Sequence, residues 1–293
     1  MNGDGKLTPP LRPEFVRETT DAGTIGDVAR PLSAWERIAN VAAVRRLLIL
    51  VVLAALWQVY ATRIDNPLLL PSFAETAAAL WQAAAHGELL MRCAVSLKVL
   101  LLGYAAGVAA AAVLTTLAVS TRIGTDLLST LTAMFNPLPA IALLPVALLW
   151  LGLGNPSLVF VLVHSVLWPV SLNTHAGFLG VPETLRMAGH NVGLTGIRYV
   201  MRILVPAAFP SILTGLKIGW AFAWRTLIAA ELVFGTSSGS GGLGWFIFVN
   251  RNQLEVANVF AGLATVILIG LFVESVVFRT IEVRTVRRWG MQR

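Results

Sequence analysis

Charged residues are scarce in this chain of 293 residues. Asp, Glu, Lys and Arg make up 13% of it and hydrophobic residues 56%, against about 25% and about 45–50% in ordinary soluble domains. A water-soluble protein with so few charges could not cover its own surface, so part of this surface must face lipid. The composition, rich in Ala, Leu and Val and without the alternation of outer-membrane strands, predicts an all-α membrane protein.

Cysteine and catalytic motifs are also lacking. Cys93 is the only cysteine, so the chain forms no internal disulfide. The sequence contains no Walker A or H-E-x-x-H motif and no Cys/His cluster with metal-ligand spacing. We therefore expect no enzyme activity, no metal site and no cofactor bound by this chain. The net charge of +7 does not indicate nucleic-acid binding, because the basic residues lie between apolar runs.

The apolar runs predict about six membrane-spanning helices. They cover approximately residues 44–62, 92–119, 127–151, 157–178, 211–234 and 257–279. Residues 1–43 are polar and proline-containing, without the apolar core of a signal peptide, so we expect a cytoplasmic tail that becomes helical near Ser33. The predicted organisation is this tail, a membrane domain over 44–280 and a basic cytoplasmic tail over 281–293.

Small residues repeat within two of the spans. The second span has Gly103, Gly107 and Ala111 at four-residue spacing, a pattern that lets two membrane helices approach closely. The fifth has a similar stripe at Gly215, Gly219 and Ala223. Both stripes predict close helix packing.

Two other features are local. Pro137, Pro139 and Pro145 lie inside the third span, where the backbone groups they leave unpaired need neighbouring helices or a water-lined cavity. This span is therefore expected inside the bundle. Ser72 and Glu75 form a capping-box pattern that predicts the start of an amphipathic helix too short to span.

The distribution of basic residues predicts the orientation, because cytoplasmic loops carry the excess of Lys and Arg. With the N-terminus inside, the inside segments contain Arg37, Arg45, Arg46, Arg122, Arg186, Arg198, Arg202, Arg284, Arg287 and Arg288, and the outside segments contain Arg63, Arg92 and Arg251. Both termini and the polar segment 180–210 are thus expected in the cytoplasm.

The segment 180–210 interrupts the apolar runs between the fourth and fifth spans. Pro182 suits the start of a helix, and Glu183 suits the positive end of its dipole. Gly193 offers a break, after which we expect a second short helix that Pro206 and Pro210 end before the next span. Two short helices at an angle would make a compact projection able to enter a groove on a soluble partner.

The spacing in this segment resembles a known family. Gly193, nine further residues and then Ile203-x-Val205-Pro206 are similar to the "EAA" loop of permease subunits of ATP-binding-cassette importers, with the pattern E-A-A-x3-G-x9-I-x-L-P. The following run, residues 206–219, is similar to the nitrate/sulfonate/taurine branch. Further similarities lie at 137–145, 151–154, 230–231 and 242–244, so the resemblance covers about residues 45–280.

One position departs from the family pattern. Met187, Ala188 and Gly189 stand where the family has E-A-A, so the usual acidic residue is missing. Glu183 lies one helical turn earlier and could present a carboxylate on the same face. The alternative is an ordinary loop between two spans.

The resemblance implies a mechanism and partners. Two permease copies, expected as a homodimer, would form the path, and the loop of each would dock on an ATPase subunit that binds ATP and Mg. A periplasmic or lipid-anchored solute-binding protein would deliver the solute, and the location would be the bacterial cytoplasmic (inner) membrane. The expected solute is a small anion such as nitrate, a sulfonate or taurine. A neutral or cationic heterocycle resembling a thiamine precursor is the alternative within the family, and a secondary transporter or an intramembrane enzyme the alternative outside it.

Ionisable residues inside a bilayer are costly and often mark a transport path. In the fifth span Trp220, Trp224 and Glu231 share a face, while Arg225 is offset from Glu231 by roughly 120°, so these two should not pair directly. All four are candidates for the translocation path. Arg225 and Trp224 could instead hold the bundle together, and Glu231 could make an interhelical hydrogen bond or a gate contact. His164 in the fourth span is expected to be a hydrogen-bonded interhelical residue and not a ligand.

Overall fold

The computed structural model describes residues 40–234 and 241–287. Most of the expected N-terminal tail, with its predicted helix near Ser33, and the last residues of the expected C-terminal tail lie outside these ranges. Within them the regular structure is entirely helical, in agreement with the predicted class. Chain contacts divide the protein into two units at Leu53/Ala54, and the site lies in the second.

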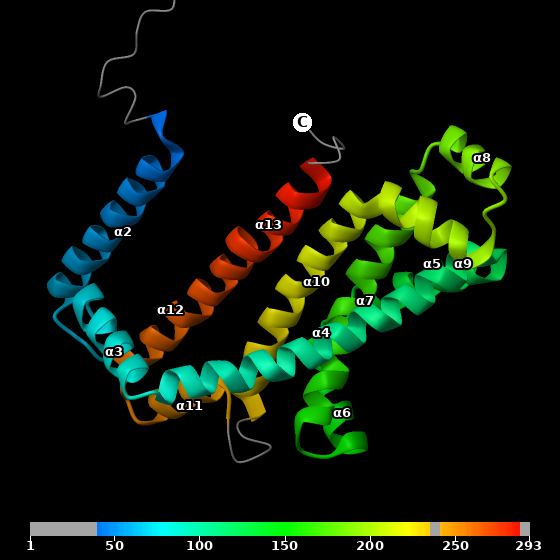
Figure 1. Cartoon of the computed structure of the whole chain (residues 1–293). Helices are drawn as coiled ribbons and strands as arrows, with labels where there is room; N and C mark the ends of the chain where they lie inside the picture. Colours follow the sequence, from blue (N-terminus) through cyan, green and yellow to red (C-terminus); the bar gives the residue numbers. More distant parts are fainter. Residues whose placement is uncertain (1–39, 235–240, 288–293) are drawn as a thin grey trace, which may run out of the picture. The chain divides into compact units, whose positions relative to one another are not determined.

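The described helices include five that are long and apolar enough to cross a membrane, or six if one bent pair counts as a span. In chain order the elements are α2 (Ala42–Ile64), α3 (Phe73–Ala85), α4 (Glu88–Ser120), α5 (Arg122–Phe135), η1 (Ala140–Leu143), α6 (Leu144–Leu151), α7 (Asn155–Leu179), α8 (Glu183–Asn191), α9 (Gly196–Tyr199), η2 (Val200–Leu204), α10 (Val205–Phe234), α11 (Leu243–Asn252), α12 (Val256–Phe272), η3 (Val273–Phe278), α13 (Arg279–Glu282) and η4 (Val283–Arg287). In Figure 1, α8 lies at one end of the second unit and α11 and α6 lie at the other. We call these the α8 end and the α11 end.

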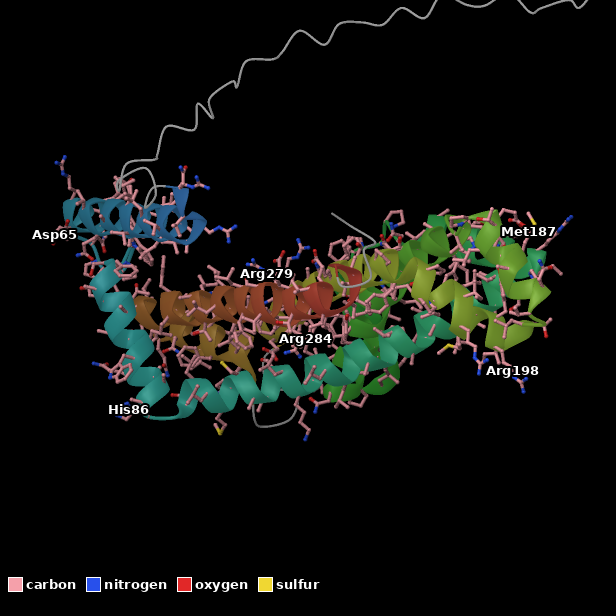
Figure 2. All side chains as sticks on the ribbon, turned by 45° about the horizontal axis from the view of Figure 1, so that its top comes forward. Asp65, His86, Met187, Arg198, Arg279 and Arg284 are labelled. Atoms are coloured by element: carbon pink, nitrogen blue, oxygen red, sulfur yellow. The ribbon has the colours of Figure 1, made fainter. Side chains whose placement is uncertain are left out.

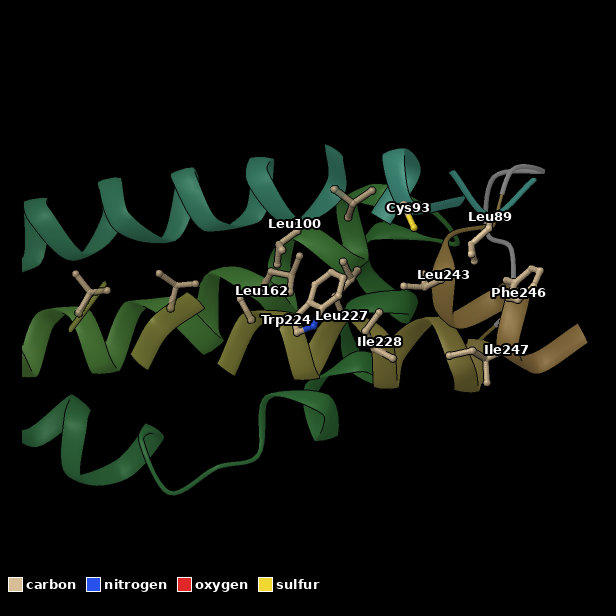
Figure 3. Close-up of a cluster of buried hydrophobic side chains, with 14 of the residues drawn as sticks. Leu89, Cys93, Leu100, Leu162, Trp224, Leu227, Ile228, Leu243, Phe246 and Ile247 are labelled. Atoms are coloured by element: carbon tan, nitrogen blue, oxygen red, sulfur yellow. The ribbon is translucent and has the colours of Figure 1, made fainter. Parts of the chain in front are cut away.

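The centre of the second unit is the packing of α4, α7 and α10. A Cβ atom on Gly103 would lie 2.5 Å from Leu162 Cβ, and one on Gly107 would lie 2.6 Å from Val166 Cβ, so α4 and α7 meet at their backbones. A Cβ atom on Gly215 would lie 2.9 Å from Asn173 Cβ. The predicted close packing of both small-residue stripes is therefore confirmed. Figure 3 shows Leu100, Leu162 and Leu227 in the buried cluster that results.

The third span is not continuous over residues 127–151. It consists of α5 and of η1 with α6, bent by 88° at Asn136–Pro139. Pro137 and Pro139 lack the N–H that a helix needs and disfavour helical backbone at Asn136 and Leu138. The prolines that the sequence places inside this span are the reason for the bend.

The helix after Gly193 also differs from its prediction. Pro206 and Pro210 do not end it, because the chain is helical without interruption from Gly196 to Val233. Just before Pro206 the ladder widens to a π-helical turn, in which the Val205 N–H donates to the Val200 carbonyl. A shift of the hydrogen-bond register at this point accommodates a residue that has no N–H. The short second helix and the fifth span are therefore one element.

The predicted amphipathic helix is α3. Its capping box is complete, because the Glu75 N–H donates to Ser72 Oγ at 3.2 Å and the Ser72 N–H donates to Glu75 Oε2 at 2.8 Å. Trp57 joins α2 to the α3 region through an Nε1–H bond of 3.0 Å to the Pro71 carbonyl. The last span runs on as a helix to Arg287, into the expected tail, where Val286 is buried.

Candidate functional site

The bend between α5 and η1 forms one wall of a cavity of about 360 Å³. The other walls belong to α7 and α10. The lining residues are Asn136, Pro137, Leu138, Pro139, Ala140, Ile141, His164, Ser165, Trp168, Pro169, Phe222, Arg225, Thr226 and Ala229. Because Pro169 lacks an N–H, the Ser165 carbonyl has no α-helical donor at this wall. The prolines thus place backbone polar groups beside the cavity within a bundle that is otherwise apolar.

Arg225 is the only formally charged residue among the described residues that line this cavity. Its Nε–H donates to the Ala221 carbonyl at 3.1 Å, and its guanidinium carbon lies 5.1 Å from the centre of the Phe222 ring. The residue is exposed in the single chain. A charge on a spanning helix is costly against lipid, so its guanidinium must face the cavity or another protein surface.

An aromatic group lies beside the charged wall. The rings of Phe135 and Trp168 are stacked with centroids 5.6 Å apart, and the His164 ring lies edge-on 5.9 Å from Trp168. Neither ring nitrogen of His164, nor Nε1 of Trp168, has a hydrogen-bond partner among the described residues. The expectation that His164 would be satisfied by an interhelical bond was therefore wrong. The sequence did not lead us to predict that His164 and Trp168 line a cavity. Pro169, which follows Trp168 inside the same span, was the feature that could have indicated it.

The other three candidate path residues lie away from the cavity. Trp224 is buried and donates from Nε1 to the Val266 carbonyl of α12 at 3.2 Å. Trp220 packs edge-on against Tyr104 at 5.4 Å. Glu231 is buried against Ser96 of α4, which donates to its carboxylate at 2.8 Å. As expected from their angular offset, Arg225 and Glu231 do not pair with each other.

The segment resembling the coupling loop is a helix and a tight turn. Gly193 ends α8 in the left-handed conformation, with φ of 75°, and its N–H donates to the His190 carbonyl at 2.9 Å. The Leu194 N–H reaches back to the Gly189 carbonyl at 3.1 Å, which completes a Schellman motif. Gly193 stands here because a side chain would strain this conformation.

Two contacts hold this segment against the rest of the bundle. Gly189 is buried, and a Cβ atom there would lie 3.0 Å from Ile203 Cγ1 and 3.1 Å from Tyr199 Cε2. Arg186 donates from Nη2 to the Phe178 carbonyl at 2.5 Å and from Nε to the Val181 carbonyl at 3.1 Å, which ties α8 to the end of α7.

The opposite face of α8 is exposed. Met187 and Ala188 are both exposed, and Glu183 reaches Arg186 at 3.9 Å while most of its side chain remains accessible. Pro206 lies partly buried at the start of α10. Figure 2 shows Met187 and Arg198 at the α8 end and His86 at the other.

A bundle of five or six spans with a charged residue on the wall of a cavity is typical of a membrane transport subunit. Residues 103–284, more than half of the chain, match the family described as "Binding-protein-dependent transport system inner membrane component". The chain belongs to this family. It is accordingly a permease subunit of the ATP-binding-cassette importer class and not the subunit that hydrolyses ATP, and the resemblance drawn from residues 45–280 is confirmed. The class implies an ATPase and a solute-binding protein as partners.

Individual relatives support the same class. A putative ABC transporter permease protein of Methanocaldococcus jannaschii is 31% identical over 75% of this chain and 82% of its own length. The nitrate import permease protein of a Synechocystis species is 31% identical over 61% of this chain and 64% of its own length. A putative aliphatic sulfonates transport permease protein of Escherichia coli is 29% identical over 69% of this chain and 75% of its own length.

Proposed function

We propose that this chain forms the translocation path of an ATP-driven importer for a small anion such as nitrate, a sulfonate or taurine, in a bacterial cytoplasmic membrane. The observation that carries this proposal is the cavity of about 360 Å³ whose only formal charge, among the described residues, is Arg225. In a site of low dielectric, one uncompensated guanidinium favours an anion and opposes a cation. Relatives named for nitrate, aliphatic sulfonates, taurine and bicarbonate agree with this chemistry.

The proposed assembly contains two copies of the chain. The exposed side of α10 carries Thr214, Ala221, Phe222 and Arg225, and lipid would be a poor neighbour for the last of these. A second copy packed on this side would enclose the two guanidinium groups in one path.

The proposed drive acts at the α8 end, for which the distribution of basic residues predicts a cytoplasmic location. Here α8 docks in a groove of the ATPase, with Met187 at the contact in place of the acidic residue usual in the family. Because α9, η2 and α10 are continuous, displacement of this end moves the helix that carries Arg225. Such a rigid-body change is a common form of switching between two states.

The test is uptake into vesicles that contain the chain, its ATPase and its binding protein. Labelled nitrate, taurine, an alkyl sulfonate and a thiamine-precursor pyrimidine are supplied in parallel, with and without ATP. We expect ATP-dependent uptake of one anion, and a fall of about tenfold or more in Arg225→Gln, since a hydrogen bond to a charged group contributes about 1.5–3 kcal/mol. Arg225→Lys should retain more activity than Arg225→Gln.

Arg251→Gln is the matched control, because Arg251 lies at the α11 end, stacks on Phe248 at 6.0 Å and does not line the cavity. Its uptake should equal that of the wild type. Uptake of the pyrimidine alone would overturn the anion assignment, and uptake without ATP would overturn the importer mechanism.

A further inference from the structure

Glu231 of α10 is buried, with 4% of its surface exposed, and two other helices satisfy its carboxylate. Ser96 Oγ of α4 lies 2.8 Å from both carboxylate oxygens. The Gly244 N–H of α11 donates to Oε2 at 2.8 Å, and the Leu243 N–H donates to Ser96 Oγ at 2.8 Å. One carboxylate therefore joins three helices at the α11 end.

The start of α11 has no room for side chains beside this carboxylate. A Cβ atom on Gly242 would overlap Glu231 Oε1 and Ser96 Oγ, and one on Gly244 would lie 2.6 Å from Glu231 Cβ. Arg92 of α4 also donates to the Gly241 carbonyl at 2.9 Å. The chain from Gly241 to Gly244 is thus fixed against α4 and α10 by hydrogen bonds and by close approach.

These contacts replace an ordinary helix cap. The first N–H groups of a helix have no partner within it, and negative charge is favourable at this end. The residue preceding α11, Gly242, has no side chain to serve as a cap. Glu231 and Ser96 supply the acceptors from neighbouring helices instead. The seated helix then buries Leu243, Phe246 and Ile247 in the cluster shown in Figure 3.

The position of Glu231 on α10 links this contact to the cavity. Arg225 precedes it by six residues, a separation of about 9 Å along the helix axis at 1.5 Å per residue. Both residues belong to the uninterrupted helix from Gly196 to Val233, which begins beside α8. One helix therefore contacts the coupling segment, the cavity and α11 in turn.

We propose that Glu231 is a positioning residue that makes α11 move with α10, so that a displacement of the α8 end changes the α11 end of the path. The proposal rests on the proposed function for the source of that displacement. The seating of α11 itself can be measured without any ATPase.

Cys93 is a native reporter of the seating. It is the only cysteine of the chain, it is buried one helical turn from Ser96, and it belongs to the same cluster as Leu243 and Phe246. Labelling by an uncharged maleimide in lipid nanodiscs then follows the population in which α11 has separated. We expect Glu231→Ala to speed labelling about tenfold or more, because it removes hydrogen bonds to a buried charged group.

Two milder variants keep the proposal testable if Glu231→Ala does not fold. Ser96→Ala and Glu231→Gln should speed labelling less, and Glu231→Gln least, because its amide oxygen can still accept from the Gly244 N–H. Thr116→Ala on α4, where the hydroxyl donates to the Ala112 carbonyl of its own helix, and Glu274→Gln at an exposed position of the last span are controls and should label as the wild type does. Labelling within about twofold of the wild type in all three Glu231 and Ser96 variants would overturn the seating.

The transmission step is measured in the complete importer as solute taken up per ATP hydrolysed. Glu231→Ala, or Ser96→Ala where that variant does not fold, should hydrolyse ATP at the wild-type rate but import several-fold less solute per ATP, a change that loss of stability alone would not give. An unchanged ratio would refute the role of Glu231 in coupling. A wild-type importer without ATP-dependent uptake would instead contradict the proposed function and leave the labelling result as it stands.

Discussion

Lys217 of α10 and Glu282 of α13 form an ion pair in which Nζ lies 2.5 Å from Oε2. The two side chains are 34% and 25% exposed, so the pair is only partly screened by solvent. It joins the half of α10 nearer to α8 to the helical extension that continues the last span, beside the buried Val286. The sequence indicated neither partner, because they are 65 residues apart.

Removal of one member of this pair should destabilise the protein. Lys217→Met leaves a partly buried carboxylate opposite an apolar side chain, and we expect a loss of about 1–3 kcal/mol in the free energy of unfolding in detergent. The double variant Lys217→Met/Glu282→Leu should recover most of this loss. Additive losses in the double variant would show that the two side chains do not interact.

The turn after α8 should be sensitive to proline. Gly193→Pro cannot adopt the φ of 75° found here and removes the N–H that donates to the His190 carbonyl. We expect co-purification of the ATPase to be abolished while insertion into the membrane persists. Deletion of Met187–Gly189 should have the same effect.

Gly87→Pro is the matched control, because Gly87 has a φ of 79° in a tight turn at the opposite end of the second unit. It should retain the ATPase. If Gly193→Pro co-purified as the wild type does, the docking surface would not be this segment.

The fold could be predicted largely from apolar runs and small-residue spacing, because both are local patterns. The stripe at Gly103 and Gly107 indicated a close helix contact, although only the structure identifies α7 as the partner. The continuous helix through Pro206 could not be predicted, because the packing around a proline decides whether it ends a helix or is accommodated by a π-helical turn. The assignment of residues 180–210 as the coupling segment rests on spacing, and it stays a prediction, as does the docking chemistry at Met187.

The site itself was harder to predict. Arg225 could be predicted as a candidate path residue because a charge within a span is costly, and the structure places it on the cavity wall. The sequence did not show that Trp224 lies away from the cavity, because it is next to Arg225 on the same helix. Only the structure shows that Trp224 is buried against α12. His164 was misjudged because its sequence environment is apolar, while its position beside the bend of another span is a tertiary feature.

Substitution of His164 should affect solute uptake without affecting the stability of the protein. Its ring makes no hydrogen bond to the described residues, so His164→Phe should change the free energy of unfolding by less than about 1 kcal/mol. If the N–H of this ring contacts the solute during passage, uptake should fall several-fold. His175→Phe, also on α7 but away from the cavity lining, is the control. Equal uptake in both variants would show that the imidazole of His164 is not part of the path.

The contact between α4 and α7 gives the most direct test of the bundle core. A Cβ atom on Gly107 would lie 2.6 Å from Val166 Cβ and 3.2 Å from the Val163 carbonyl oxygen, so no rotamer of a larger residue avoids the α7 backbone. Gly107→Val should therefore force the helices apart and destabilise the protein by about 1–3 kcal/mol or more. Gly180→Ala is the control, since its Cβ atom would meet nothing closer than 3.5 Å. Thermal unfolding in detergent measures both variants, and equal midpoints would contradict the packing of these two helices.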